Sequence, residues 1–246
     1  MDSADNLLCI DVGNTRSKAA VYGDGGLLAF AEGDDLDIGR LTEWKHRFGL
    51  QHAMLSAVAE DERLPVPVLR TLFSLHFPKD ACGLPFRIAY RTPETLGADR
   101  LACMAAAASL FPQRPSLVLQ CGTCLTIDYL TSDALYAGGS ISPGLQMRFR
   151  SLKEFTARLP LACADPNAAL YGDSTLSSIQ SGVLQGYLSE CAGMIQKYMA
   201  INEHLMVIVT GGDAAFVKDN LEMTIFVFPN LVLYGLMLML RYDIEK

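Results

Sequence analysis

The chain has 246 residues, of which 50% are hydrophobic and 19% are charged. This composition is typical of a folded protein with a substantial core, and it excludes a disordered chain. The net charge is -7 and the Lys and Arg residues are scattered, so we expect no direct binding to nucleic acid.

In the first half of the chain, short apolar runs that stop at turn residues predict strands, and longer amphipathic runs predict helices. The turn residues at 23–26 favour a hairpin between two of these strands. The predicted elements are, in order, strands at 7–12, 17–22 and 25–33, a helix at 41–48, a strand at 52–58, a short helix within 64–77, a strand at 86–90 and an Ala-rich helix at 101–111.

The second half repeats the opening pattern. Residues 116–130 hold an apolar strand, a Gly-Thr turn and a second strand, as residues 7–22 do with a Gly-Asn-Thr turn. This partial repeat predicts an α/β protein of two similar halves, residues 1–113 and 114–246. The other predicted elements are a rigid loop at 138–144, helices at 145–159 and 177–199, a strand, turn and helix within 205–217, and a buried strand followed by a buried helix within 224–240.

The first turn carries a motif that suits phosphate, DVGNT at residues 11–15. Gly13 lets the backbone approach a ligand closely, while Arg16 and Lys18 add positive charge. An acid beside a phosphate repels it unless a divalent cation lies between them, so Asp11 is a candidate Mg²⁺ ligand, directly or through water. The alternative interpretation is an ordinary Asx-type hairpin turn.

The second candidate motif is GADR at residues 97–100, where a helix is expected to begin. Asp99 is a candidate general base, because a carboxylate within hydrogen-bond reach can accept the proton of an attacking hydroxyl. Arg100 is a candidate to bind a substrate carboxylate or to stabilise phosphoryl charge. Considered alone, Asp99 is better explained as a helix N-cap.

Two glycine-rich segments are further candidates for ligand contact. The sequence GGSISPG at 138–144 opens a helix whose N-terminus would attract anions, and Gly211-Gly212 would leave room for adenine or ribose. Both segments also suit ordinary turns. Cys121 and Cys124 have CxxC spacing, but a strand pattern follows them instead of a helix, so we expect structural thiols there and no metal or redox site.

Taken in order, these motifs resemble those of type III pantothenate kinases, which belong to the acetate kinase, sugar kinase and actin superfamily. The resemblance implies a duplicated ribonuclease H-like fold with ATP in the cleft between the halves. It also implies transfer of the ATP γ-phosphate to the primary hydroxyl of pantothenate, the first step of coenzyme A synthesis. The motifs that carry it are DVGNT, GADR, GTCLTID at 122–128, GGSISPG, GDSTLSSIQSG at 172–182, TGGDA at 210–214 and NLVLYGL at 230–236.

The resemblance implies a role for individual residues as well. Asp99 would accept the substrate proton, and Asp11 would hold Mg²⁺. The family is dimeric, with its substrate pocket near the subunit interface, and it uses a divalent cation and usually K⁺ or NH₄⁺, so we expect a homodimer. The expected ATP-binding residues are Asp11, Val12, Gly13, Asn14, Thr15, Arg16, Ser17, Lys18 and Thr123. The expected pantothenate-binding residues are Tyr90, Gly97, Ala98, Asp99, Arg100 and Thr175.

One position departs from the family pattern. The second loop of the family normally reads Asp-x-Gly-Thr, and its Asp binds the monovalent cation, whereas this chain has Gln120 at that position. The amide of Gln120 offers a carbonyl oxygen without a charge, so it should hold a cation less well. We therefore expect weak or absent dependence on K⁺, while the motifs for phosphoryl transfer remain complete.

Pantothenate follows only from the resemblance, so two alternatives stay open. One is a kinase for another small hydroxyl substrate, and the other is a non-catalytic regulatory or accessory protein that binds nucleotide. The N-terminal segment carries Asp2 and Asp5 and no basic region, so we expect no signal peptide. The number of cysteines is seven, and an odd number favours free thiols over disulfide bonds. Pro229 breaks the most apolar segment, leaving a run too short to span a bilayer. We expect a cytoplasmic protein with reduced thiols.

Overall fold

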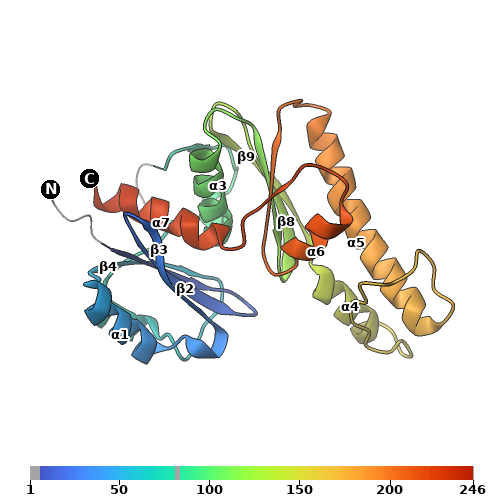
Figure 1. The fold of residues 1–246 in the computed structure, drawn as a ribbon, viewed down its shortest axis with the longest axis horizontal. Coiled ribbons are helices and arrows are strands. Elements are labelled where there is room, and N and C mark those ends of the chain that lie inside the picture. The colour runs from blue at the N-terminus through green and yellow to red at the C-terminus, as the bar shows by residue number, and fades with distance from the viewer. Residues whose placement is uncertain (1–5, 81–83, 246) are drawn as a thin grey trace. The chain divides into compact units, whose positions relative to one another are not determined.

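The computed structural model describes residues 6–80 and 84–245, so Asp2, Asp5 and Cys82 lie outside the described residues. By its internal contacts the chain forms two compact units. The first unit contains the residues up to Leu110 together with those from Asn230 onward, and the second runs from Phe111 to Pro229. Figure 1 shows their helices and strands, coloured from blue at the N-terminus to red at the C-terminus.

The first unit is built on a five-stranded sheet. Its elements are β1 (Leu7–Val12), β2 (Ser17–Gly23), β3 (Gly26–Glu32), a 3₁₀ turn η1 (Gly33–Asp35), α1 (Ile38–Phe48), β4 (His52–Ala57), α2 (Val66–Leu72), β5 (Ser74–His76), β6 (Arg87–Ile88), a 3₁₀ turn η2 (Pro93–Thr95), α3 (Ala98–Leu110) and α7 (Leu231–Ile244). The strand order is β3-β2-β1-β4-β5. The pairs β1–β2 and β2–β3 are antiparallel, whereas β4 and β5 extend the sheet in the direction of β1.

The second unit repeats this arrangement. Its elements are β7 (Ser116–Cys121), β8 (Cys124–Leu130), β9 (Leu135–Pro143), α4 (Leu145–Glu154), α5 (Thr175–Met199), β10 (Met206–Thr210), α6 (Ala214–Asn220) and β11 (Phe226–Val227). Of the six strands in this sheet, the five that belong to the second unit run in the order β9-β8-β7-β10-β11, with an antiparallel hairpin series on one side of β7 and parallel strands on the other. The two units therefore share one strand order and one set of directions, which confirms the α/β fold with a duplicated sheet.

In the first unit, strand β1 is covered on both faces, as expected for the central strand of a sheet with a parallel neighbour. Leu8 and Ile10 share a buried cluster with Leu41 and Trp44 of α1. Because successive side chains of a strand alternate between faces, Asp11 lies on the opposite face, against which α7 packs. The sheet of this unit is thus sandwiched between α1 on one side and α3 with α7 on the other (Figure 1).

The contact between α3 and α7 depends on small residues. A Cβ atom at Gly235 of α7 would overlap the carbonyl oxygen of Ala102 in α3. The Ala-rich sequence of α3 leaves its residues 100–107 buried. The two helices can therefore approach each other closely and together cover the sheet face on which Asp11 lies.

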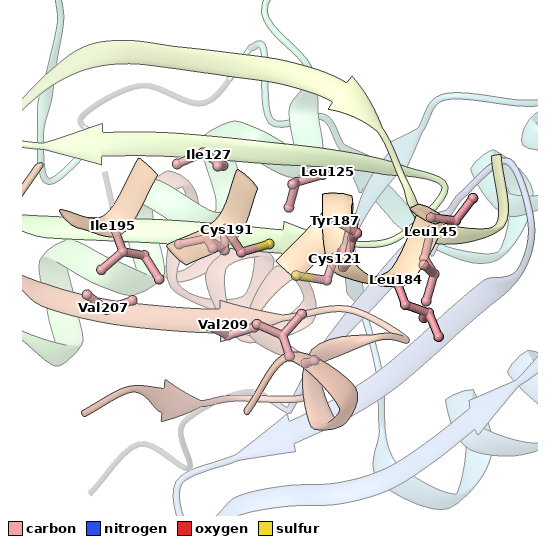
Figure 2. Close-up of a cluster of buried hydrophobic side chains, with 14 of the residues drawn as sticks. Cys121, Leu125, Ile127, Leu145, Leu184, Tyr187, Cys191, Ile195, Val207 and Val209 are labelled. Carbon is pink, nitrogen blue, oxygen red and sulfur yellow. The ribbon is translucent and has the colours of Figure 1, made fainter. Parts of the chain in front are cut away.

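In the second unit, the long helix α5 packs on one face of the sheet. Figure 2 shows Leu184, Tyr187, Cys191 and Ile195 of α5 directed toward side chains of the underlying strands. Helix α5 begins with a capping box, in which the Ser174 and Ser177 side chains each bond the backbone of the other residue. Its apolar face and its cap explain why 25 residues form one uninterrupted helix.

Three predicted elements are wrong in kind or length, two in the second unit and one in the first. The predicted rigid loop at 138–144 is largely strand β9, which ends at Pro143. A Cβ atom at Gly139 would overlap the carbonyl oxygen of Ile127, and Gly138 has φ 107° beside an irregularity in the pairing with β8. These glycines serve a close, bulged strand pairing. The predicted helix at 145–159 ends at Glu154, and the strand expected at 86–90 is reduced to β6.

The C-terminal helix belongs to the first unit by its contacts. It packs on α3, β1, β2 and β4, whereas the division of the sequence at residues 113 and 114 had placed it with the second half. The apolar side chains of α7 cover strands β1, β2 and β4, the last of which ends at Ala57, and no local pattern reveals so distant a contact. Within residues 6–80 and 84–245, every helix is too short or too polar to cross a bilayer.

Candidate active site

The turn between β1 and β2 is the first part of the candidate site. Its backbone is closed by the Gly13 N–H, which donates to the Arg16 carbonyl at 3.2 Å. The Val58 N–H, just beyond β4, donates to the Val12 carbonyl at 3.0 Å and ties the turn to the neighbouring strand. Asn14, Thr15 and Arg16 are exposed, so their polar side chains can reach a ligand.

A cavity of about 450 Å³ borders this turn. Residues 13–17 line one side, and residues 59–63, which follow β4, line the other. Val12 and Ala57 are level with each other in the parallel pair β1–β4, so both segments leave the sheet at the same edge. The carboxyl ends of parallel strands are the usual place for a ligand in open α/β sheets. The cavity thus lies where the DVGNT motif predicted phosphate.

Asp11 has an electrostatic environment unlike that of a surface acid. Burial raises the pKa of its carboxyl group to about 6, and the nearby Asp99 carboxylate raises it as well. The Ser56 hydroxyl and the Lys18 ammonium group act in the opposite direction. The Ser56 oxygen is itself buried and has no hydrogen-bond partner among the described residues. Asp11 is therefore a partly desolvated carboxylate that lacks full compensation for its charge.

Asp99 lies in the first turn of α3, close enough to Asp11 to affect its pKa. The Gly97 carbonyl accepts from the Leu101 N–H at 3.1 Å, so Gly97 precedes the helix and Asp99 is its second helical residue. The N-cap interpretation of Asp99 is therefore wrong. A Cβ atom at position 97 would lie 2.5 Å from Asp99 Oδ1, so the glycine leaves the space that this carboxylate occupies.

Arg100 follows Asp99 but is directed differently. It is only 5% exposed, and its guanidinium carbon lies 5.6 Å from the centroid of the Tyr90 ring. A cation over an aromatic face is held in a fixed orientation and is stabilised most when water is excluded. Within the first unit, the structure thus places Asp99 and Lys18 within electrostatic range of Asp11, Gly97 beside Asp99, and Arg100 over Tyr90.

In the second unit, three glycine-containing segments meet at the turn between β7 and β8. The Gly144 N–H donates to the Thr123 carbonyl at 3.1 Å, and a Cβ atom at Gly144 would overlap the Gly122 carbonyl. The Asp213 N–H donates to the Cys121 carbonyl at 3.0 Å. A Cβ atom at Gly211 would overlap the same carbonyl. The motifs GTC, SPG and TGGD therefore form one local structure around Thr123.

The CxxC spacing does not produce a pair of thiols. Cys121 at the end of β7 is level with Leu125 on β8, and both side chains belong to the same buried cluster. Cys124 precedes Leu125 in the strand, so its side chain points to the other face of the sheet. Cys121 instead meets Cys191 of α5, as Figure 2 shows. This contact and burial together raise the pKa of the Cys191 thiol.

A second cavity, of about 1040 Å³, lies between α4, α5 and the segment that joins them. Thr175, the first residue of α5, lines it together with Asp173 and Ser174. Arg148 of α4 borders it too, forms an ion pair with Glu190 and lies 5.2 Å from the Tyr187 ring centroid. The cavity thus combines hydroxyl groups with one positioned cation.

Comparison with known proteins shows the family to which this chain belongs. The model of the type III pantothenate kinase family matches residues 7–197. This chain belongs to the type III pantothenate kinase family. A type III pantothenate kinase from Christiangramia forsetii is 40% identical over 240 residues, which cover 96% of this chain and 98% of that relative. The family, the ATP-dependent kinase class and the place in coenzyme A synthesis that the motifs implied are confirmed.

Solved structures support the fold independently. A Campylobacter jejuni protein assigned to the Baf family of transcriptional activators superposes with a TM-score of 0.62 at 20% identity, over 98% of this chain and 100% of that chain. Glucokinase from an Antarctic psychrotroph gives a TM-score of 0.52 at 10% identity, over 96% and 99%. At such identities the likeness concerns the fold alone, and it supports the duplicated α/β fold.

Two residues at the first cavity were missed from the sequence. Asp61 and Arg63 lie in the charged stretch AEDER at 59–63, which reads as a solvated loop. Their place in the chain could have revealed them, because this stretch directly follows β4, a strand that runs parallel to β1. Charged residues at the carboxyl end of such a strand are candidates for ligand contact.

Proposed function

We propose that Asp99 is the proton acceptor in the transfer of the ATP γ-phosphate to the primary hydroxyl of pantothenate. The supporting observation is that Asp99 and Asp11 lie within electrostatic range of each other beside the turn of β1 and β2. The Asp99 carboxylate can then accept the proton, while the Asp11 carboxylate binds a cation. Family membership supplies ATP and pantothenate as the substrates.

The chemistry requires one proton acceptor and a fixed phosphate. As the pantothenate hydroxyl oxygen attacks the γ-phosphorus, its proton passes to the Asp99 carboxylate. The bond from the γ-phosphorus to the oxygen that bridges it to the β-phosphate breaks, which leaves ADP. Gly97 supports this role because it leaves the Asp99 carboxylate unobstructed.

Asp11 fits a divalent cation by its chemistry. A desolvated carboxylate with incomplete compensation gains from a positive ion, and Mg²⁺ prefers one or two carboxylates with phosphate oxygens and waters. We assign Mg²⁺ to Asp11, directly or through water. When bound, the ion would offset the negative charge of the phosphates.

Nucleotide and substrate binding are assigned by the family motifs and supported by local geometry. Arg100 is a candidate for the pantothenate carboxylate, since its guanidinium is held over Tyr90. Thr175 borders the larger cavity. The proposed ATP contacts are Asp11, Val12, Gly13, Asn14, Thr15, Arg16, Ser17, Lys18 and Thr123, and the proposed pantothenate contacts are Tyr90, Gly97, Ala98, Asp99, Arg100 and Thr175.

A homodimer fits the exposed surface of the second unit. Phe155 and Tyr171 are 84% and 81% exposed, and Leu161, Leu170 and Leu176 are exposed near them in sequence. Large exposed apolar side chains concentrated in one segment, residues 155–176, are typical of a protein–protein contact. We assign this surface to the dimer, and we assign the protein to the cytoplasm.

The test is ATP-dependent phosphorylation of pantothenate by the full chain with Mg²⁺, with mass spectrometry of the product. We expect 4′-phosphopantothenate. Folded protein that binds ATP but yields no product would refute pantothenate as the substrate. A panel of other small hydroxyl compounds would then separate another kinase activity from a non-catalytic role.

A further inference from the structure

Ser17 differs from the other residues at the turn of β1 and β2. It is only 3% exposed, whereas Asn14, Thr15 and Arg16 before it are exposed. Its hydroxyl donates to Asp61 Oδ2 at 2.6 Å. The single hydroxyl proton of Ser17 is therefore used within the protein, and the residue links the start of β2 to the segment that follows β4.

Arg63 holds the Asp61 carboxylate on its other sides. Asp61 Oδ1 accepts from the Arg63 backbone N–H and from Nε, both at 3.0 Å, and Asp61 Oδ2 accepts from Arg63 Nη2 at 3.0 Å. Arg63 Nη1 donates to the Gly33 carbonyl at 2.8 Å and to Asp34 at 3.0 Å. The Arg63 side chain, with Ser17, holds the pKa of Asp61 well below its usual range, so Asp61 is an anion at neutral pH.

These bonds surround the cavity proposed for phosphate. Ser17 and Asp61 both line it, and the backbone bond between Val58 and Val12 closes the same edge. A buried hydroxyl at residue 17 fixes the point from which residues 13–16 project. An unpaired carboxylate at this place would repel a triphosphate, and the guanidinium of Arg63 offsets that charge.

We propose that Asp61 is a positioning residue for ATP, which fixes the phosphate-binding turn through Ser17, and that Arg63 neutralises Asp61 beside the phosphates. The proposal rests on the proposed ATP site at residues 11–18. Arg63 acts through Asp61, since its guanidinium nitrogens are already bonded to Asp61, Gly33 and Asp34. Neither residue belongs to the proposed pantothenate site, so we expect both to affect the nucleotide alone.

The first experiment is a double-mutant cycle on the Kd of MgATP, measured by calorimetry with the full chain. Ser17→Ala should weaken binding about tenfold, equivalent to about 1.4 kcal/mol, in the native background. In an Asp61→Ala background the same change should weaken binding less than twofold, because the bond it removes is already absent. Equal losses in both backgrounds would show that Ser17 acts without Asp61 and would overturn the proposal.

The second experiment tests the charge of Asp61. Arg63→Gln should raise the Kd and the KM for ATP about tenfold while the KM for pantothenate stays within twofold of the original. Asp61→Asn combined with Arg63→Gln should recover at least part of that loss, because the uncompensated negative charge of Asp61 is gone. A further loss in the combined variant would indicate direct contact of Arg63 with phosphate and would overturn the proposal.

Controls distinguish the loss of this positioning role from a failure to fold and from a failure of the proposed function. Asp35→Ala removes an exposed acid of the same 3₁₀ turn as Asp34, and its MgATP Kd should not change. Thermal unfolding identifies a variant that fails to fold, for which Ser17→Cys serves as a milder replacement. If the native chain binds MgATP but does not phosphorylate pantothenate, the Kd cycle still decides the proposal. If it binds no MgATP, the proposal fails together with the ATP site.

Discussion

Asp11 and Gln120 occupy equivalent positions in the two sheets. Each is the next-to-last residue of the first strand of its unit, β1 or β7. Each is level with a hydroxyl residue on the parallel neighbouring strand, Ser56 on β4 and Thr210 on β10. Duplication thus offers the chain two similar places for a cation ligand, and only the first retains a carboxylate.

The absent charge at Gln120 predicts a weak response to monovalent cations. Adding KCl to a sodium-buffered assay should change kcat less than twofold in the native chain. Gln120→Asp restores a negative charge at the strand end and should give a clear activation by K⁺ that NaCl does not reproduce. A strong K⁺ activation of the native chain would show that the amide is a sufficient ligand.

Burial of Asp11 predicts that the apo protein gains stability when its charge is removed. With a folded pKa of about 6 and an unfolded value near 3.8, Asp11 stabilises the fold below pH 4, and this contribution is lost as the pH rises through 6. Asp11→Asn should therefore raise the free energy of unfolding at pH 7.5 by at most about 3 kcal/mol.

The measurement for Asp11 is urea unfolding of both chains in EDTA between pH 4 and 7.5. The difference between them should shrink to less than about 1 kcal/mol at pH 4, where the carboxyl is protonated in the folded chain and roughly half protonated in the unfolded chain. The same variant should bind MgATP poorly. An Asp11→Asn chain that is less stable than the native one at pH 7.5 would contradict the assigned environment of Asp11.

Asp99→Asn should slow the reaction about 10²–10⁴-fold, the range typical of general-base catalysis. The Kd of MgATP should stay within twofold, because the amide keeps the shape of the carboxylate. Loss of the favourable charge near the N-terminus of α3 costs about 0.3–1 kcal/mol, too little to unfold the protein. A normal kcat would assign the proton to another acceptor.

Gly97→Ala should reduce kcat without unfolding the protein. The new methyl group would lie 2.5 Å from Asp99 Oδ1, so the carboxylate must rotate away. A displacement near 1 Å from a productive geometry can cost about 10²-fold in rate. The matched control is Gly193→Ala in α5, where a Cβ atom meets nothing within 4 Å. Kinetics and thermal unfolding of both variants would check this, and an unchanged kcat for Gly97→Ala would argue against Asp99.

The sequence reveals the parts of the fold and site that depend on local pattern. Strands β1 and β2 and the turn at Asp11 follow from an apolar run that meets glycine, and α3 follows from its alanines. The glycines of β9 were misleading, because glycine marks turns more often than close strand pairing. The proximity of Asp61 to Ser17 depends on β4 pairing with β1, and this pairing joins residues far apart in the sequence.

The position of α7 has a consequence for how the chain is made. The second unit is one continuous segment from Phe111 to Pro229, whereas the first needs the last residues of the chain to cover its sheet. During synthesis, the strands of the first unit emerge before the second unit, but the helix α7 that covers their sheet emerges after it, so the second unit can fold first. We therefore expect the N-terminal sheet to be the part most dependent on chaperones, and loss of the C-terminal helix to damage the end of the protein farthest from it in sequence.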